Sequence, residues 1–599
     1  MPHDRQRLRP ARSSSARPPT RSRRGRAHVR LRVGLVLITM VLSVLAARLV
    51  QLQGLDPGSY AEMAAAEGTV DMVLPAERGE ILDRNGVALA SSVDGMMVIA
   101  DPQLTEENAT ELATLFSERL DVDYFDTLAQ LRDTEFRFRY VARRVPSTLA
   151  QETLDVIDEA GYDGITLQQD PVRDYPAGDV AANLVGFLGA DEKPRLGMEL
   201  TFDGLLRGRD GEARYTSGAG NRIPLGENST TDPIDGRDLR LTIDRDVQWT
   251  VQRELRNAVE DARGDSGVAV VMDTQSGEVL ALADHPTFDA SQPSLSPKED
   301  YGSRALSDVY EPGSVLKVMT VAGLLDAEEV TPTTRITVPS ELDSGDSVIG
   351  DYWDHGTLRL TVAGAISQSS NIGTVLAARR MSPTALHDYL TGFGLGSVTG
   401  VGVRGESAGI LPDAATWTPM AADRIAFGQS VSVNALQMTA AVNTIANGGV
   451  HVDPSLVEGR ATTDAGEAVG TEQSTSERVV SEVAARQTSD ILEQVVDPDE
   501  GVAPGAAVPG YRVAGKTGTA QRVNPECQCY DGTFTVSFGG FAPADDPRFT
   551  VYVAVQNPRN GGGGGSVGGP AFSRIMGAVL RHYAVPPTGS RPARLPIEW

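Results

Sequence analysis

The sequence predicts an α+β fold with a mostly antiparallel sheet, and three observations support it. Apolar runs typical of strands occur early, in "GVAVVMDTQSGEVLALADHP" (267–286), and again late, in "TFTVSFGGFAP" and "RFTVYVAVQNP". The two early runs flank "DTQSG", which is a hairpin signal. Helical patterns lie between the early and late strands, including the one that follows the turn in "LSDVYEPGSVLKVMTVAGLLDA".

The first 32 residues form a basic tail with eleven arginines and one acidic residue, Asp4. The rest of the chain carries 43 basic and 79 acidic residues, so its surface would repel phosphates, and nucleic-acid binding is excluded as its function. Residues 33–53 follow the tail and are mostly apolar. Their length approaches the roughly 20 residues that cross a bilayer, so they are predicted to form a transmembrane anchor.

The charges beside the anchor predict its orientation. The arginine-rich tail 1–32 places the N-terminus in the cytoplasm and everything after residue 53 outside the membrane. A cleaved signal peptide and a buried soluble helix are the alternatives, but the basic flank is long and no clear small-x-small site follows the apolar run. A single-pass protein of the plasma membrane is therefore expected.

Two domains and a tail are expected after the anchor. Residues 54–235 are polar, rich in acids and punctuated by Gly, Asp, Asn and Pro, which implies many turns between short elements. A boundary at 236 is expected because "GRDLRLTIDRDVQWTVQRELRNAV" then begins a strand followed by a long amphipathic helix. The main domain would span 236–585, with "NGGGGGSVGG" (560–569) as a flexible loop, and the Pro-rich residues 586–599 would form a loose tail.

The chain has two cysteines, Cys527 and Cys529 in "NPECQCYDG", which is too few for a disulfide framework. An oxidising exterior permits a bridge between them, so a local loop staple and two free thiols both remain open. A Cys-x-Cys pair without clustered histidines is a weak metal signal. No metal site and no other cofactor are predicted.

The stretch "YEPGSVLKVMT" (310–320) places Ser314 three residues before Lys317. Ser314 falls at or near a helix N-terminus, where serine is most often a capping residue. Lys317 lies on the same helix face, and burial can remove the proton of a lysine so that it acts as a base. Only four of the 54 basic residues are lysines, and arginine cannot be deprotonated in a protein. The presence of a lysine at position 317 therefore favours the interpretation of Ser314 as a nucleophile with Lys317 as its base, over that of Ser314 as a simple helix cap.

Two further motifs follow along the chain. "AISQSSNIGTV" contains Ser369-x-Asn371, which is a weak signal when taken alone. "AGKTGTAQ" places Lys516 on a predicted strand, where Gly518 would let a substrate backbone approach closely. The threonines beside this lysine suit the binding of a carboxylate, and a turn with a surface lysine is the alternative.

Seven histidines offer no competing catalytic triad. His285 in "ADHPTFD" and His355 in "WDHG" lie in predicted loops and are interpreted as structural residues. A serine–lysine pair is therefore favoured over a serine–histidine pair.

The ordered set of Ser314-x-x-Lys317, Ser369-x-Asn371 and Lys516-Thr517-Gly518 resembles the three signatures of penicillin-recognising serine enzymes. "RGEILDRNG", "RDYPAG", "GMELTFDGLL" and "VSFGGFAPADDPRFTVYVAV" extend the similarity to the class B penicillin-binding proteins over roughly residues 35–585. "GESAGILP" with "IAFGQSVSV" is most similar to the division type, FtsI. The resemblance implies a transpeptidase domain with helices on both faces of its sheet, a pedestal domain of the dimerisation type at 54–235, and an anchored peptidoglycan D,D-transpeptidase.

The resemblance also implies acyl transfer through a covalent intermediate. Ser314 would attack the penultimate D-Ala carbonyl of a stem peptide, and Lys317 would take the serine proton. An amine from a neighbouring stem would then resolve the acyl-enzyme into a cross-link, whereas β-lactams would stall at the acyl stage. Ser369 and Lys516 would relay a proton to the leaving amine, and Asn371 would hold the peptide amide. The Ser314 and Thr519 N–H groups would form an oxyanion hole. Substrate binding would involve Thr517, Gly518 and Thr519.

The implied partners are peptidoglycan stem peptides, β-lactams, a membrane glycan polymerase and other division proteins at the septum. No glycosyltransferase domain is seen between anchor and pedestal, which disfavours class A. An elongation-type transpeptidase is the nearest alternative, and a carboxypeptidase side activity stays open. A β-lactamase would need a base for deacylation and normally has no pedestal. A β-lactam sensor or non-catalytic scaffold would not need Ser314, Lys317 and Lys516, and all three are present.

Overall fold

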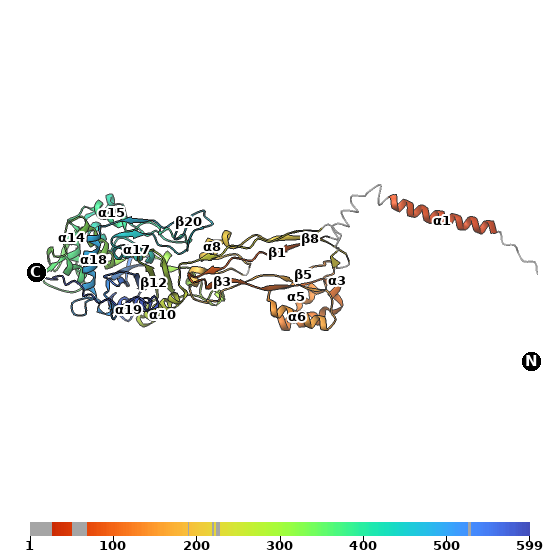
Figure 1. Ribbon diagram of the computed structural model, residues 1–599, viewed down its shortest axis with the longest axis horizontal. Coiled ribbons are helices and arrows are strands. Elements are labelled where there is room, and N and C mark those ends of the chain that lie inside the picture. The colour runs from red at the N-terminus through yellow and green to blue at the C-terminus, as the bar shows by residue number, and fades with distance from the viewer. Residues whose placement is uncertain are drawn as a thin grey trace, which may run out of the picture. The chain divides into compact units, whose positions relative to one another are not determined.

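A computed structural model of the chain describes residues 27–50 and 69–599, except for 190, 219–220, 223–227, 525–526 and 528 (Figure 1). The chain divides into two compact units. One consists of Met1–Val73 and Glu212–Thr231, and the other of Leu74–Gly211 and Asp232–Trp599.

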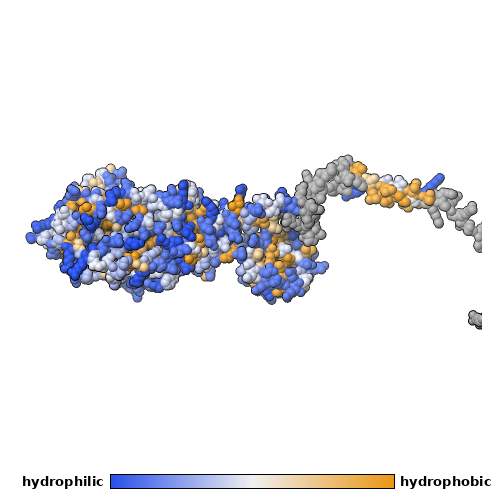
Figure 2. Space-filling model, viewed as in Figure 1, coloured by the Kyte–Doolittle hydropathy of each residue, from blue (hydrophilic) through white to orange (hydrophobic). Residues whose placement is uncertain are grey.

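The first unit contains the predicted membrane segment, which forms the helix α1 (Ala27–Val50). Its stretch Leu31–Arg48 is long and apolar enough to cross a membrane and has no buried part. Apolar residues cover much of the visible surface of α1 in Figure 2. Residues 1–26 of the predicted basic tail and 51–53 of the predicted anchor lie outside the described residues. The same unit holds a sheet of β1 (Thr69–Leu74), β8 (Gly211–Gly218) and β10 (Ser229–Thr231) in that order, with β9 (Asn221–Arg222) paired to β8.

In the second unit, the part before residue 211 forms two small sheets, one of them together with β11, and contains a core of its own. Phe116, Leu112 and Ile157 are buried where helices cover the three-stranded sheet. The sheet orders are β5–β4–β6 and β11–β2–β3–β7. These elements are β2 (Ile81–Leu82), β3 (Ala88–Val93), β4 (Gly95–Ala100), α3 (Pro102–Thr105), α4 (Ala109–Leu120), α5 (Tyr124–Leu131), β5 (Arg139–Pro146), α6 (Ser147–Glu159), β6 (Ile165–Gln169), β7 (Val172–Asp174), α7 (Ala182–Val185), α8 (Gly197–Thr201), α9 (Asp203–Leu206) and β11 (Leu239–Arg240).

Three sequence motifs of this region meet at one buried carboxylate. Glu199, from "GMELTFDGLL", has no exposed surface and accepts from Arg78 Nε of "RGEILDRNG" at 2.7 Å. Arg173 Nε of "RDYPAG" donates to its other oxygen at 2.7 Å, and Tyr175 donates to that oxygen at 3.3 Å. A buried carboxylate with two cationic partners is costly to disrupt, so this cluster ties together segments that lie more than 90 residues apart.

The main domain is built on a five-stranded antiparallel sheet in the order β13–β12–β24–β23–β22, which confirms the predicted fold class. The helices α10 and α19 pack on one face and α17 on the other. Phe538 contacts Phe572 of α19, whereas Thr550 on the opposite face donates to Asn443 of α17 at 2.7 Å. The strands are β12 (Ser266–Asp273), β13 (Val279–His285), β22 (Ala514–Asn524), β23 (Cys529–Ala542) and β24 (Phe549–Gln556), and the helices are α10 (Arg245–Ala262), α17 (Ala435–Ala446) and α19 (Gly568–His582).

Further helices and four two-stranded sheets are described between β13 and β22 (Figure 1). The helices are α11 (Arg304–Ser307), α12 (Lys317–Asp326), α13 (Val362–Ser367), α14 (Asn371–Ala378), α15 (Pro383–Gly392), α16 (Pro419–Ile425) and α18 (Glu482–Val495). The paired strands are β14 (Arg335–Val338) with β17 (Leu358–Thr361), β15 (Leu342–Ser344) with β16 (Ser347–Ile349), β18 (Val450–Val452) with β21 (Ser476–Arg478), and β19 (Ala461–Thr462) with β20 (Ala468–Val469).

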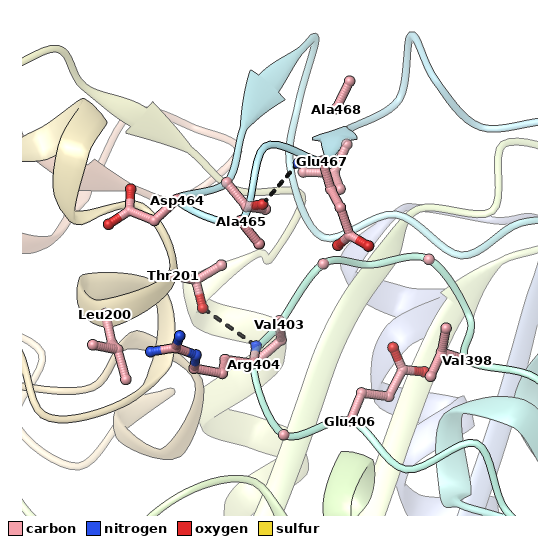
Figure 3. Close-up of a pocket in the computed structure, with 15 residues that line it drawn as sticks. Leu200, Thr201, Val398, Val403, Arg404, Glu406, Asp464, Ala465, Glu467 and Ala468 are labelled. Carbon is pink, nitrogen blue, oxygen red and sulfur yellow. Dashed lines mark hydrogen bonds between the residues drawn. The ribbon is translucent and has the colours of Figure 1, made fainter.

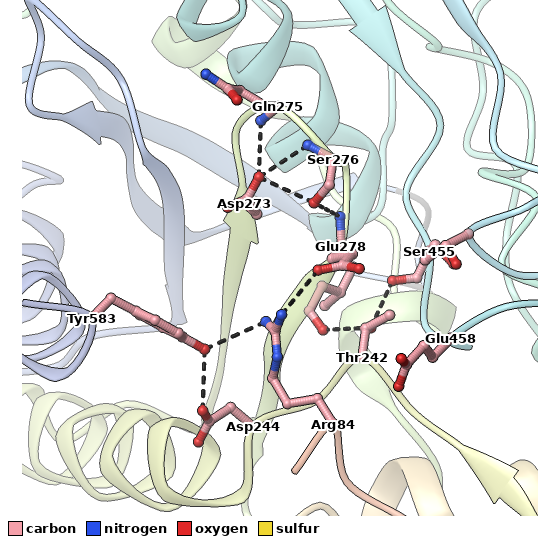
Figure 4. A network of polar contacts seen from close by, with 12 residues as sticks. Arg84, Thr242, Asp244, Asp273, Gln275, Ser276, Glu278, Ser455, Glu458 and Tyr583 are labelled. Carbon is pink, nitrogen blue, oxygen red and sulfur yellow. Dashed lines mark hydrogen bonds and ion pairs between the residues drawn. The ribbon is translucent and has the colours of Figure 1, made fainter. Parts of the chain in front are cut away.

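A polar network joins the turn between β2 and β3 to the main domain (Figure 4). Arg84 forms an ion pair with Glu278 at 3.2 Å and donates to the Tyr583 hydroxyl at 3.5 Å. Tyr583 in turn donates to Asp244, the residue that caps α10, at 3.1 Å. The end of α19 and the start of α10 are thus held together at this contact.

The prediction of a loose C-terminal tail at 586–599 is wrong for its last residues. The Ile597 carbonyl accepts from Thr361 N at 2.9 Å, and Trp599 N donates to the Arg359 carbonyl at 3.1 Å. An edge strand such as β17 has backbone N–H and C=O groups available for pairing. The last residues of the chain pair with these groups, although the proline-rich sequence before them suggested a loose tail. The tail therefore packs against the main domain.

The two cysteines are bonded to each other, at the end of the hairpin formed by β22 and β23. Of the two alternatives that the sequence left open, this is the local staple. The bridge closes a loop next to the strand that carries Lys516.

Candidate active site

Ser314 lies in a 3-10 turn, Gly313–Leu316, that leads directly into α12. The residue at the capping position is Pro312 and no side-chain cap forms there, so the interpretation of Ser314 as a helix cap is not met. Gly313 adopts a positive φ of +55° and its N–H donates to the Gly428 carbonyl at 2.9 Å. A Cβ on Gly428 would lie 2.0 Å from the Gly313 carbonyl oxygen. Glycine is therefore needed where the segments "AFGQ" and "EPGS" meet.

Lys317 is fully buried at the first position of α12. Its Nζ donates to the Ser369 carbonyl at 2.7 Å and to Asn371 Oδ1 at 2.8 Å. Burial lowers the pKa of Lys317 to about 7, and the nearby Asp351 carboxylate opposes this by favouring the charged form. A large fraction of this amine is therefore neutral near pH 7 and able to accept a proton.

Ser369 joins both buried lysines. Its carbonyl accepts from Lys317, and its hydroxyl accepts from Lys516 Nζ at 2.8 Å. The backbone of Ser369 has a φ of +60°, a left-handed conformation that costs a non-glycine residue about 1–3 kcal/mol. Such strain persists only where neighbouring contacts enforce it, and Ser370 does so by capping α14 through Gly373 N at 2.8 Å.

Lys516 is fully buried on β22, so the alternative of a turn with a surface lysine is excluded. Besides Ser369 it donates to Thr517 Oγ1 at 3.0 Å. Burial and the positive charge of Lys317 hold its pKa well below the ordinary value. β22 is the edge strand of the main sheet and therefore has one side open to an extended ligand.

The motif residues meet in one cleft of about 900 Å³. Ser314, Ser369 and Asn371 line it together with Thr517 and Thr519 of β22. The structure thus brings together all three motifs, which lie up to 202 positions apart in the sequence, as Ser314 and Lys516 do. A second hollow of about 490 Å³ lies elsewhere, between α8 and the 398–406 loop, where Arg404 N donates to Thr201 Oγ1 at 3.4 Å (Figure 3). None of the motif residues lines that hollow.

Gly518 has a packing role that the sequence did not indicate. A Cβ at this position would lie 2.2 Å from Ser537 Oγ and 3.0 Å from the Pro312 carbonyl. Glycine fits at this position because the Ser537 side chain of β23 and the turn that carries Ser314 both lie against it. Gly313 shows the same proximity, since a Cβ there would lie 2.8 Å from the Thr519 carbonyl.

Two groups of cleft residues were not identified from the sequence. One is the glycine strap, defined as Gly561–Ser566, which lines the cleft and whose Gly564 N donates to Thr519 Oγ1 at 3.3 Å. The run of five glycines was a visible signal, but a flexible loop was the interpretation. The other is the loop after β16, where Tyr352 lines the cleft and Asp351 contacts the Ser-x-Asn segment. No local pattern marks these residues.

Two family models match this chain. A family model of the penicillin binding protein transpeptidase domain matches residues 267–577, and one of the penicillin-binding protein dimerisation domain matches residues 73–241. The chain belongs to the class B penicillin-binding proteins.

Relatives of this class B penicillin-binding protein align over nearly its whole length. It is 35% identical to the penicillin-binding protein PbpB of Mycolicibacterium smegmatis, over 93% of this chain and 91% of that protein. It is 32% identical to the peptidoglycan D,D-transpeptidase FtsI of Escherichia coli K12, over 92% of this chain and 91% of that protein. Penicillin-binding protein 3 of Mycobacterium tuberculosis, solved in complex with aztreonam, superposes with a TM-score of 0.68 at 29% identity, over 88% of this chain and all of that one.

The glycine strap of this penicillin-binding protein predicts different effects at two neighbouring positions. A Cβ on Gly564 would lie 2.3 Å from the Ser537 carbonyl and 2.5 Å from the Gly518 carbonyl, so Gly564→Ala must displace the strap or β22. A Cβ on Gly563 meets only the Thr519 side chain, at 3.1 Å. We expect Gly564→Ala to lower the rate constant for acylation by a β-lactam by roughly 10- to 100-fold, and Gly563→Ala by no more than about threefold. Equal rates for the two variants, with equal melting temperatures, would show that the strap does not position β22.

Proposed function

We propose that this protein is a peptidoglycan D,D-transpeptidase that cross-links stem peptides during septal wall synthesis, through an acyl-enzyme on Ser314. The observation that carries the proposal is the convergence of two buried lysine amines on Ser369, in the cleft that Ser314 also lines. Burial favours the neutral form of both amines, so Lys317 is suited to act as the base.

In the first step, the Ser314 hydroxyl oxygen forms a bond to the carbonyl carbon of the penultimate D-Ala. Its proton passes to the neutral amine of Lys317, whose pKa of about 7 suits a base that works near neutral pH. In the described residues, Lys317 Nζ donates to Ser369 and Asn371. The distance between Lys317 Nζ and the Ser314 hydroxyl would shorten when substrate is bound. The bond to the terminal D-Ala then breaks.

The leaving amine needs a proton, and the hydroxyl of Ser369 is suited to supply it. Because Lys516 donates to the Ser369 oxygen, the hydrogen of that hydroxyl is free to point elsewhere. Lys516 would then replace the proton. The carboxylate of the terminal D-Ala would favour the charged form of Lys516, which the apolar surroundings otherwise disfavour. Thr517, Gly518 and Thr519 are proposed to bind this end of the substrate.

An oxyanion hole made of the Ser314 and Thr519 N–H groups is supported by the proximity of their two segments, since Gly313 lies against the Thr519 carbonyl. Two donors aimed at the developing negative charge would stabilise the tetrahedral intermediate. An amine from a second stem peptide then attacks the acyl-enzyme by the reverse sequence of proton transfers and releases Ser314.

The anchor and the cellular role are also part of the proposal. The helix α1 would cross the plasma membrane once, with the N-terminus in the cytoplasm and the catalytic domain outside. The family matches include a transpeptidase and a dimerisation domain, so a separate membrane polymerase would supply the glycan strands. The relatives named FtsI and PbpB support a place at the division septum with other division proteins.

Penicillin is expected to acylate Ser314. Labelling the protein with a fluorescent penicillin, followed by proteolysis and mass spectrometry, should find the adduct on the peptide that contains this residue. Ser314→Ala should abolish labelling and leave the melting temperature close to that of the wild type, because the side chain makes no cap. An adduct on another serine, or labelling of Ser314→Ala, would overturn the assignment.

Lys317 and Lys516 should respond differently to arginine. Arginine at 317 stays charged and cannot accept a proton, so Lys317→Arg should lower the acylation rate constant by about 10⁴-fold. Lys516→Arg keeps a cation for the substrate carboxylate and should lower it by about 10- to 10³-fold. The wild-type rate should fall as pH drops below the Lys317 value of about 7, because protonation removes the base. Equal small losses in the two folded variants would remove the general-base role of Lys317.

Depletion of the protein should give cells that lengthen without forming septa. This result follows from a role in septal cross-linking, and microscopy during depletion measures it. Rounded cells that still form normal septa would instead favour an elongation-type transpeptidase.

A further inference from the structure

Asp351 is a buried carboxylate outside the three motifs. It lies in the loop after β16, and its side chain has no exposed surface. Its two oxygens accept four hydrogen bonds, from Ser370 Oγ at 2.6 Å, Asn371 N at 2.6 Å, Ile372 N at 3.1 Å and His355 Nε2 at 3.1 Å. Three of these four donors belong to the Ser-x-Asn segment or the first turn of α14.

The contacts of Asp351 bear directly on the partners of the two lysines. Asn371, whose N–H it holds, accepts from Lys317, and Ser369, one residue earlier, accepts from both lysines. Ser369 has the left-handed backbone described above, which needs its neighbours to be fixed. Asp351 supplies that fixation, because a carboxylate can accept all of these donors at once.

His355 completes the arrangement. Its side chain is 5% exposed, and its two ring nitrogens both face acceptors, Asp351 Oδ2 at 3.1 Å and the Gly356 carbonyl at 2.5 Å. An N–H on Nε2 donates to Asp351 and holds the ring beside the carboxylate. Lys317 and Tyr352 are ionisable groups that interact electrostatically with Asp351.

We propose that Asp351 and His355 are positioning residues of the transpeptidase reaction, forming a hydrogen-bonded histidine–carboxylate pair that fixes the Ser-x-Asn segment and thereby the partners of Lys317. The proposal rests on the proposed function, since it assumes that Lys317 is the base. It changes the interpretation of His355, which the sequence suggested was only a structural loop residue.

The chain contains a matched control for this pair. Asp244 caps α10, accepting from Asp246 N and Val247 N, and it also accepts from His582 Nε2 at 3.0 Å. Like Asp351, it is a buried carboxylate at a helix N-terminus with one histidine partner. It lies in the network of Figure 4, and neither Asp244 nor His582 lines the cleft of Ser314. Variants of this second pair therefore measure the stability lost when a helix cap is removed, without changing the cleft of Ser314.

The test measures the rate constant for acylation by penicillin from about pH 5 to about pH 9, with melting temperatures, for Asp351→Asn, His355→Gln, Asp244→Asn and His582→Gln. Asp351→Asn replaces one acceptor oxygen by a donor, so the segment loses its fixation and acylation should fall by about 10²-fold. His355→Gln keeps one donor and should lower it by about 10-fold. The two control variants should lower the melting temperature comparably but leave the acylation rate and its pH profile unchanged.

The pH profile distinguishes positioning from a purely structural role. Asp351 raises the pKa of Lys317, so its loss should move the acidic limb of the profile to lower pH. His355→Gln keeps the Asp351 charge and should leave this limb where it is. A shifted limb in Asp351→Asn alone, with slower acylation in both variants, supports the proposal. An unshifted limb in Asp351→Asn, or losses no larger than in the Asp244 and His582 variants, overturn it.

Failure of the proposed function would look different. If wild-type protein is not acylated at Ser314, the transpeptidase assignment fails and these variants have no rate to compare. If Ser314 is acylated normally in the wild type and equally fast in Asp351→Asn, only the positioning role is removed.

Discussion

Two lysine amines buried around one serine are the constraint on which the site depends. Lys317 and Lys516 have no exposed surface, and each contacts Ser369. Two ammonium groups in so small an apolar space would repel each other and lack the water that stabilises charge, so burial drives them toward the neutral form. The lowered pKa values of the two lysines follow from this packing.

The surrounding fold is arranged to maintain that burial. Lys317 is the first residue of α12, Ser369 lies two residues before α14 in a strained backbone conformation, and Lys516 lies on the edge strand β22. None of these elements could hold the geometry alone. Close contacts that leave no room for a side chain join β22 to the Ser314 turn, as at Gly313 against the Thr519 carbonyl, and join that turn to Gly428. Asp351 then fixes Ser370 and Asn371, which directly follow the residue that contacts both amines.

The region before residue 211 repeats this principle with opposite charge. Glu199 is a buried carboxylate that Arg78 and Arg173 satisfy from segments far apart in the chain. A buried charge with partners contributes little net stability, but removing one partner is costly, so it defines which segments must meet. The motifs "RGEILDRNG", "RDYPAG" and "GMELTFDGLL" are thus explained by one ion cluster, and the contact of Arg84 with Glu278 joins the same region to the main domain.

Local patterns in the sequence determined the antiparallel sheet, the helix that follows Ser314, the apolar segment in α1 and the three ordered motifs. These features depend on periodicity and on residue type, and the scarcity of lysine made Lys317 and Lys516 visible. Only the tertiary structure decided that Asp351 and His355 belong to the site, that the glycine strap lies against β22, and that Ile597 pairs with Thr361. Each of these contacts joins segments whose own sequences favour a loop or a tail. Their partners are chosen by the packing of the whole domain, which no local pattern encodes.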